Sequence, residues 1–469
     1  MSIEPIGLAA LAVVAISFFL DYGTMVIVLV TASVLGAAAA IIIGGANIQP
    51  AHLFLGAVGL NALMRPRQCA GMLLALRPGK PGFWLLCLVA YALVSAFFFP
   101  RIMAGSTLIF PIGSTSFDAT GSTVPLAPVS GNITQSIYIV GSFAVFLIVT
   151  SCASDHSGFR TAVAAILSYA VANAAFGLLD LATYLTGTQG LLEVIRNAKY
   201  AMHTETEMQG LKRVVGSFTE ASSFGRSSIG ALGFVATLWL CGIRPLYTGG
   251  LAILTFLLAV MSTSSAALVS LPVMMALLYL TVLSRSARGL GTRGGLVLIV
   301  ALPLVALAAV LGVLAHPGLS AVIGDYLNAL VFSKAGSDSG VERSSWNAAA
   351  LQNFIDSGGL GVGLGSIRTS SLAMALVGGV GAIGTLFYLG FVAMAFLRNP
   401  GVPGGYFTDV RTAARNGCIG MAVGDLMLSS NVDQGILFYA LAGLAAARPE
   451  YRGASRTPVA PSPSSTVLA

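Results

Sequence analysis

The residues best suited to bind a ligand are three arginines in polar segments between long apolar stretches: Arg213, Arg343 and Arg368. Arginine stays charged at physiological pH and binds phosphate oxygens through two parallel hydrogen bonds. Several arginines beside a membrane therefore predict a site for a lipid-linked phosphate or pyrophosphate. Anchoring to lipid headgroups is the alternative for any one of them.

The segment around Arg213 leads from one apolar stretch into the next. Glu220 follows Arg213, and a helix is expected to begin at Ser222 or Ser223, either of which could cap it. Upstream of Arg213, apolar residues at near-helical spacing predict an interfacial helix lying on the membrane. These residues are Leu191, Leu192, Ile195 and Met202.

Arg226 falls inside the apolar helix that this segment enters. A guanidinium in hydrocarbon costs several kcal/mol, so such a residue usually faces a polar cavity and has a partner. Glu220, Asp180 and Asp433 are the candidate partners. Arg226 is therefore either part of the binding site or half of a structural ion pair.

The segment around Arg343 predicts a helix from Glu342 to Asp356. Arg343, Trp346 and Asn347 would share one side of that helix because they are spaced i, i+3, i+4. Five glycines follow at 358, 359, 361, 363 and 365, ahead of Arg368. The glycine run lacks the G-x-x-x-x-G-K-[ST] pattern of a nucleotide-binding loop, although its backbone amides could still bind phosphate.

Metal and nucleophile motifs are missing from the sequence. The four histidines (52, 156, 203 and 316) do not cluster, and neither H-E-x-x-H nor G-x-S-x-G occurs. The five cysteines have no metal-ligand spacing and are expected to be small apolar residues inside helices. We therefore expect no metal and no cofactor.

Composition indicates the elements that must position these residues. Of 469 residues, 9% are charged and 56% are hydrophobic, whereas a soluble domain carries roughly 25% charged residues. A soluble globular protein is excluded, and the fold class predicted is an all-α polytopic membrane protein. About 12–14 transmembrane helices are expected in a single domain over residues 1–447, followed by a disordered tail over 448–469. The candidate spans are 5–20, 24–46, 51–64, 82–99, 132–153, 161–185, 219–241, 248–263, 265–283, 295–315, 371–397, 416–430 and 434–447.

The positive charge predicts orientation. Alternate short loops and the tail hold 15 of the 24 Lys and Arg residues and only three acids, which places them in the cytoplasm. The opposite side receives the long segments 100–131, 186–218 and 316–370. The net charge of +7 is thus a topology signal, and nucleic acid is excluded as a partner.

Two stretches of the chain resemble the O-antigen ligase and polymerase superfamily, which includes the Wzy-type polysaccharide polymerases. The matching text is RVVGSFTEASSFG (213–225) and RSSWNAAALQNFIDSGGLGVGLGS (343–366), followed by GGVGAIGTLFYLGF (378–391). The resemblance implies a glycosyltransferase of the bacterial inner membrane, with a GT-C-like fold and two large ordered periplasmic loops. It also implies a metal-independent enzyme whose donor is an undecaprenyl-pyrophosphate-linked glycan. By motif, Arg213 and Arg343 match the arginines that bind the donor pyrophosphate.

The expected reaction is polymerisation of lipid-linked repeat units at the periplasmic face. Arg213, Arg343 and Arg368 would neutralise the pyrophosphate as it leaves, with Arg226, Trp346 and Asn347 as further binding residues. A single displacement would invert the anomeric centre. Glu220 would be the general base if burial raises its pKa, and His316 is the alternative. A chain-length regulator protein is a possible partner.

Two other functions remain open. Ligases of this superfamily commonly carry His-Asn after the glycine run, where this chain has SIRTSS. Transfer of the glycan to another acceptor is therefore the first alternative. A polysaccharide-related transporter or flippase is the second, since Asp425 and Asp433 lie near two short spans.

Overall fold

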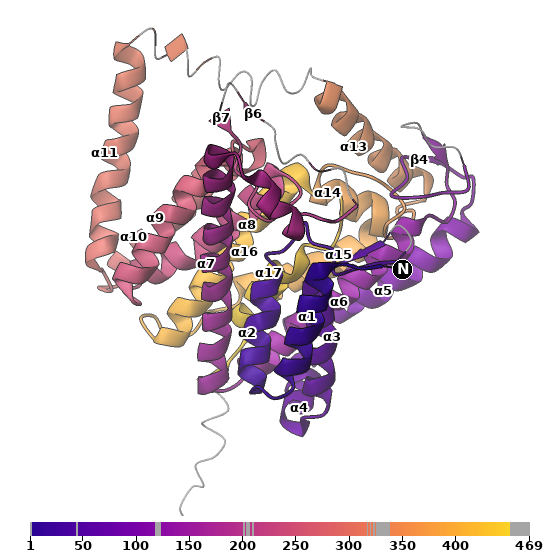
Figure 1. Ribbon diagram of the computed structural model, residues 1–469, viewed down its shortest axis with the longest axis horizontal. Coiled ribbons are helices and arrows are strands. Elements are labelled where there is room, and N and C mark those ends of the chain that lie inside the picture. The colour runs from indigo at the N-terminus through magenta and orange to yellow at the C-terminus, as the bar shows by residue number, and fades with distance from the viewer. Residues whose placement is uncertain are drawn as a thin grey trace, which may run out of the picture.

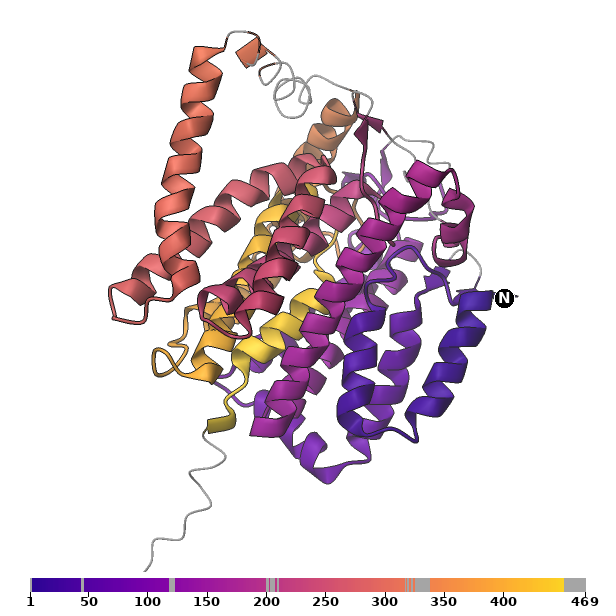
Figure 2. The same cartoon turned by 60° about the vertical axis from the view of Figure 1, so that its left-hand side comes forward.

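The computed structural model describes residues 2–43, 46–117, 123–199, 211–316 and 338–450, with isolated positions at 202, 207, 208, 318, 320, 321 and 324. These residues form a mostly helical protein with only short strands. Figure 1 shows the helices gathered into a bundle, with α11 standing at one side of it, and in the turned view of Figure 2 α11 again stands at the edge. The coarse prediction of an all-α membrane protein is confirmed.

The N-terminal part of the chain, up to Ile102, combines short helices and one long helix with a small antiparallel sheet. Strands β1 (Ser2–Ile3), β2 (Ile41–Ile43) and β3 (Ala46–Ile48) pair in that order. The helices are α1 (Pro5–Ser17), α2 (Tyr22–Ala32), α3 (Pro50–Leu63), α4 (Pro66–Ala75) and α5 (Pro81–Ile102). The expected span over 24–46 is therefore wrong in its second half. The chain turns after α2, because Gly36 packs against Phe218 and Ala37 donates to the Ser217 carbonyl instead of continuing the helix.

The central part of the chain supplies six helices: α6 (Ser130–Cys152), α7 (His156–Thr186), α8 (Ala221–Leu240), α9 (Pro245–Met261), α10 (Ser265–Ser286) and α11 (Arg293–Ala315). Two strand pairs flank them, β4 (Leu108–Ile109) with β5 (Val124–Pro125) and β6 (Glu207–Met208) with β7 (Leu211–Lys212). The 3-10 helix η1 (Gln189–Ile195) lies between α7 and β6. It takes the place of the longer interfacial helix predicted there, and it buries Leu192 while Leu191 stays exposed.

The C-terminal part begins with α13 (Asp338–Asp356), which confirms the helix predicted over 342–356. One interrupted helix follows as α14 (Leu372–Met374), η4 (Ala375–Val380), α15 (Gly381–Val392) and η5 (Ala393–Leu397). Helices α16 (Tyr406–Leu428) and α17 (Gly435–Ala446) complete the bundle. Residues 448–450 are described, and Glu450 binds Arg411. The disorder of the tail stays a prediction. The rest of that tail lies outside the described residues.

Six helices in the described ranges are long and apolar enough to cross a membrane: Pro81–Ile102, Ser130–Cys152, His156–Thr186, Ser265–Ser286, Arg293–Ala315 and Leu372–Leu397. Five shorter apolar helices accompany them. Apart from the second span, the helices begin and end within a few residues of the expected spans, except that α16 starts ten residues before its span. The total of 12–14 crossings stays a prediction.

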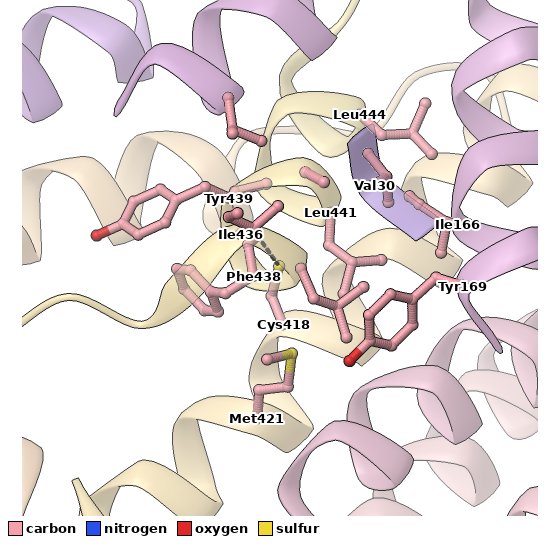
Figure 3. Close-up of a cluster of buried hydrophobic side chains, with 14 of the residues drawn as sticks. Val30, Ile166, Tyr169, Cys418, Met421, Ile436, Phe438, Tyr439, Leu441 and Leu444 are labelled. Atoms are coloured by element: carbon pink, nitrogen blue, oxygen red, sulfur yellow. Dashed lines mark hydrogen bonds between the residues drawn. The ribbon is translucent and has the colours of Figure 1, made fainter. Parts of the chain in front are cut away.

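Helix α17 lies at the centre of the bundle, and its sequence, GILFYALAGLAA, is apolar on every side, so each of its faces can pack against a neighbouring helix. Figure 3 shows Phe438, Tyr439 and Leu441 of this helix among side chains from α2, α7 and α16. Phe438, Tyr439 and Leu441 have no exposed surface. This packing fixes the helices that carry the candidate site.

The two ends of the bundle differ in composition. At one end, Arg67 pairs with Asp155, Arg285 with Asp409, and Arg411 with Glu450, so the loops predicted to be cytoplasmic meet there. At the other end, β6, β7, α13 and β4 lie together at the upper edge of Figure 1. We call these the basic end and the loop end. Which end faces the cytoplasm stays a prediction from the charge pattern.

Candidate functional site

The side chains predicted on one face of α13 meet the segment that carries Arg368. Trp346 places its ring 5.1 Å from the guanidinium carbon of Arg368, within the range of a cation–π contact. Asn347 donates from Nδ2 to the Ser370 hydroxyl at 3.0 Å and accepts from the Ser370 amide at 3.0 Å. We call Arg343, Trp346, Asn347, Arg368 and Ser370 the α13 surface. It joins two parts of the chain that are about twenty residues apart.

The two arginines of the α13 surface keep their hydrogen-bonding capacity. Arg343 is half-buried, Arg368 is exposed, and no acidic side chain in the described ranges pairs with either. Arg368 is anchored through its backbone, whose amide donates to the Phe110 carbonyl at 2.8 Å. Two guanidinium groups on one surface without counter-charges are suited to an anionic ligand.

Helix α13 is held against the segment between α5 and α6. Buried Asn353 donates from Nδ2 to the Leu108 carbonyl at 2.7 Å and to the Thr107 hydroxyl at 2.9 Å. Thr107 in turn donates to Asp356 at 2.6 Å. Hydrogen bonds from Thr107 and then Gln352 hold the pKa of the Asp356 carboxyl below its usual value. These contacts set the position of α13 on the bundle.

The glycine-rich segment packs tightly on neighbouring backbone. Gly361 and Gly365 have φ angles of 78°, and a side chain at either would strike the backbone of Gly379 and Gly381 or of Gly131. The amides of Val362 and Gly363 donate to the carbonyls of Gly378 and Gly379 at 2.9 Å. Those of Gly361 and Leu364 donate to the Ser357 and Ser95 hydroxyls. Because protein acceptors take these amides, the glycine run is a packing device and not a phosphate cradle.

A small cleft lies between the glycine-rich segment and the connection from α16 to α17. Gln135, Gly365 and Asn431 are among its lining residues, and the space holds little more than a water molecule. Asn132 of α6 donates from Nδ2 to the carbonyl of Leu364, one of the lining residues, at 2.8 Å. This cleft is therefore too small for anything larger than a water molecule.

The segment that carries Arg213 is organised by Asp180, which is completely buried near the end of α7. One carboxylate oxygen of Asp180 accepts from the amides of Val215 and Gly216 at 2.7 and 3.1 Å. The other pairs with Arg196 at 2.7 Å. Asp180 was a candidate partner for Arg226, and that expectation is wrong because Asp180 is occupied by this loop.

Arg213 and Glu220 lie at the two ends of that loop. Arg213 is half-buried, and its neighbour Val214 donates to the Met261 carbonyl at 3.1 Å, beside the turn between α9 and α10. Glu220 occupies the N-cap position of α8 and accepts a hydrogen bond from the Ser222 hydroxyl. Neither Ser222 nor Ser223 caps α8, because the helix begins at Ala221, ahead of both.

Arg226 is about 9 Å further along α8 than Glu220, from six residues at 1.5 Å each. It forms a two-pronged ion pair with Asp425 of α16, including a hydrogen bond of 2.7 Å from Nη2 to Oδ2. Nη2 also donates to the backbone carbonyl of Gln434 at 2.7 Å. The side-chain amide of Gln434 donates from Nε2 to Asp425 at 2.8 Å. The partner is thus Asp425 and none of the three candidates expected.

The turn between α9 and α10 carries a strained residue that the sequence gave no reason to single out. Thr263 has a φ of 44°, in the left-handed region that a β-branched residue rarely adopts. It is buried, and no described residue hydrogen-bonds to its hydroxyl. Ser262 and Ser264 beside it are also buried. Strained, polar and close to the segment of Arg213, this turn extends the candidate site.

The described residues of the candidate site include no cluster of metal-binding side chains. The described part of the chain has no group of three or more His, Cys, Asp or Glu residues that could hold a metal ion. His316, the alternative base, is exposed at the end of α11, and Figure 1 shows α11 on the side of the bundle away from α13. His203 lies outside the described residues.

The candidate site thus has three parts at the loop end: the α13 surface, the loop from Arg213 to Glu220, and the turn at Thr263. Thr369 links the first to the α16–α17 connection, donating to the Ser429 carbonyl at 3.3 Å. No protein-family model matches the chain. A search of curated proteins also finds no match. The chemistry must therefore be argued from the residues themselves.

Proposed function

We propose that this chain is a membrane glycosyltransferase that polymerises lipid-linked oligosaccharide repeat units. Its donor would be a glycan on undecaprenyl pyrophosphate, and its acceptor a second lipid-linked repeat unit. The observation that carries the proposal is the α13 surface. It presents Arg343 and Arg368 without acidic partners in the described ranges, next to an exposed loop end on an apolar bundle.

The stacking of Arg368 on Trp346 supports an anionic ligand over a structural ion pair. A guanidinium that stacks on an aromatic ring has a fixed orientation, while its N–H groups stay available for hydrogen bonds. Arg343 occupies the preceding turn of α13, on the same face as Trp346. Together the two groups could bind a pyrophosphate, whose charge exceeds what one arginine neutralises.

The reaction we infer is a single displacement at the anomeric carbon. The acceptor hydroxyl forms the new C–O bond, the bond from C1 to the pyrophosphate oxygen breaks, and the electron pair leaves with undecaprenyl pyrophosphate. Arg343 and Arg368, with Arg213 from the loop before α8, would stabilise the growing negative charge of that leaving group. Glu220 would accept the hydroxyl proton, and the anomeric centre would invert.

In this proposal Arg226 holds the site in place. Its bonds to Asp425 and Gln434 fix α8 to α16 and α17 below Glu220. Asn347 has a comparable part, since both ends of its amide bind Ser370. Both were predicted to bind substrate, and that role stays a prediction.

The test is synthesis by the purified full-length protein. Lipid-linked repeat units are extracted from a strain that lacks the chain and are incubated with the protein in detergent and a metal chelator. We expect a ladder of glycans, its loss in Arg343→Ala, Arg368→Ala and Arg213→Ala, and an unchanged ladder in Glu342→Ala. Glu342 is the matched control because it is charged, exposed and adjacent on α13. Ladders of wild-type length from the arginine variants would overturn the assignment.

Two other functions predict different products of gene deletion. Single lipid-linked repeat units indicate a polymerase, whereas full-length polymer that is never attached indicates a ligase. A transporter or flippase is favoured by one observation, the charged pair of Arg226 and Asp425 between helices. That function predicts loss of transport in Asp425→Asn with intact polymerising activity in detergent.

A further inference from the structure

A cluster of basic residues surrounds the connection from η5 to α16 at the basic end. Three guanidinium groups converge on consecutive backbone carbonyls there. Arg411 donates to Pro400 at 2.7 Å, Arg448 donates to Asn399 and Pro400 at 2.8 Å, and Arg415 donates to Arg398. Hydrogen bonds from these three arginines therefore hold the connection in place.

Two further cations stand at the rim of this cluster. Lys80 immediately precedes α5 and is half-buried, and the side chain of Arg398 is exposed at the end of η5. The ring of Trp84, one helical turn after Lys80, packs against Gly390 of α15, so α5 begins beside the interrupted helix that ends just before Arg398. Burial lowers the pKa of Lys80, and the charges of Arg398, Arg448 and Arg77 lower it further, in keeping with this placement.

The described acidic side chains near this basic cluster already have basic partners. Glu450 binds Arg411 at 2.7 and 3.1 Å, and Asp409 is taken by Arg285. No acidic side chain among the described residues pairs with Lys80 or Arg398. Mutual repulsion of cations favours binding of an anion from outside the chain.

The surface above these cations is apolar. Trp84 is one helical turn from Lys80, half-buried, and its ring lies 6.4 Å from that of Phe387 on α15. Leu397, next to Arg398, is 82% exposed. Tryptophan is enriched at the level where lipid headgroups meet the hydrocarbon. Charge below and apolar surface above match a molecule with a phosphate head and acyl chains.

We propose that Lys80 and Arg398, backed by Arg448, bind the phosphate of an anionic phospholipid, whose acyl chains lie along α5 and η5 over Trp84 and Leu397. This site is at the opposite end of the bundle from the α13 surface and does not depend on the proposed function. The positive residues of this end would then hold a specific lipid in addition to setting orientation.

The experiment compares two double variants of the full-length protein. Lys80→Gln with Arg398→Gln removes the proposed contacts. Arg288→Gln with Arg293→Gln removes the same charge from exposed positions at the same end, in the turn from α10 to α11. Binding of phosphatidylglycerol and of phosphatidylcholine is measured by native mass spectrometry as the lipid is titrated. Circular dichroism and size exclusion confirm that both variants are folded.

We expect wild type and the control to retain phosphatidylglycerol over phosphatidylcholine. The Lys80 and Arg398 variant should bind phosphatidylglycerol about 30-fold more weakly, which corresponds to about 2 kcal/mol. An equal loss in both variants would mean generic attraction of a basic surface and would overturn the site. If inorganic phosphate at equal concentration displaces phosphatidylglycerol, the site binds a free anion, and the proposal of a lipid site would be wrong.

Discussion

Arginine has opposite surroundings in the bundle interior and on the α13 surface. Arg226 donates to Asp425 and to the Gln434 carbonyl, so a protein acceptor meets each side of its guanidinium. Arg343 and Arg368 have no acidic partner in the described ranges, and Arg368 lies against the ring of Trp346. The difference separates arginines that stabilise the fold from arginines that remain able to bind.

The same difference applies to glycine and amide groups. The amides of the glycine-rich segment donate to neighbouring carbonyls and serine hydroxyls, whereas the guanidinium groups of Arg343 and Arg368 have no acidic partner in the described ranges. A motif is therefore informative about binding only when its hydrogen bonds are accounted for. Substitutions at four places in the molecule test where the boundary between the two regions lies.

The largest effect is expected inside the bundle. Asp425→Ala leaves Arg226 buried without its counter-charge, and the free energy of unfolding should fall by about 3–5 kcal/mol. Thermal or denaturant unfolding in detergent measures this loss. Arg67→Ala, which breaks the exposed pair with Asp155, is the control and should cost at most about 1 kcal/mol.

The double variant Arg226→Met with Asp425→Leu sharpens the first test, because it removes both charges together. Most of the lost stability should return. If Asp425→Ala is as stable as wild type, the ion pair does not stabilise the fold. Arg226 would then be grouped with the arginines that remain able to bind a ligand.

The next effect concerns the α13 surface and should appear in the rate alone. Arg343→Ala or Arg368→Ala should lower the rate of glycan transfer by about 10²–10³-fold, the usual loss when one donor to a developing negative charge is removed. Unfolding free energy should stay within about 0.5 kcal/mol of wild type, since both side chains lie at the surface. Arg343→Lys should recover part of the rate by keeping the charge. A drop in stability as large as the drop in rate would contradict the division drawn above.

Much of the architecture follows from local sequence. The spans of α5, α6, α10 and α11 are readable as apolar runs, and the shared face of Arg343, Trp346 and Asn347 follows from helical spacing. Charge bias also predicts the loops that meet at the basic end. These features depend on neighbours within a few residues.

Contacts between distant segments were not predictable. Helices α11 and α17 are both apolar on every side, yet α17 is buried at the centre while the spanning window of α11 has no buried residue. The partner of Arg226 was missed because it lies 199 residues away on α16, and three other acids were equally plausible. Thr263 was missed because its strain resides in a backbone angle.

A smaller effect is expected where Asn347 holds Ser370. Asn347→Ala should lower kcat/KM about tenfold, mainly through a higher KM, because the segment of Arg368 loses its tie to α13 while the guanidinium groups remain. Ser370→Ala should do the same. In the double variant the two losses should not add, with a coupling energy of about 0.5–1.5 kcal/mol. Additive losses, or a fall in kcat alone, would place Asn347 at the reacting atoms instead.

The smallest effect is a gain in stability at the turn between α9 and α10. Thr263→Gly removes a β-branched side chain from a φ of 44°, which should raise the free energy of unfolding by about 1 kcal/mol. Activity should fall, because the buried hydroxyl beside the segment of Arg213 is lost with the strain.

Arg244 provides the matched control for Thr263, since it has a φ of 48° at the N-cap of α9, toward the basic end of the same helix. Arg244→Gly should give a similar gain in stability and leave glycan transfer unchanged. Strain at Thr263 belongs to the site only if the two variants differ in activity while they agree in stability. Equal activity in both would remove the turn from the site, and the site would then consist of the α13 surface and the loop from Arg213 to Glu220.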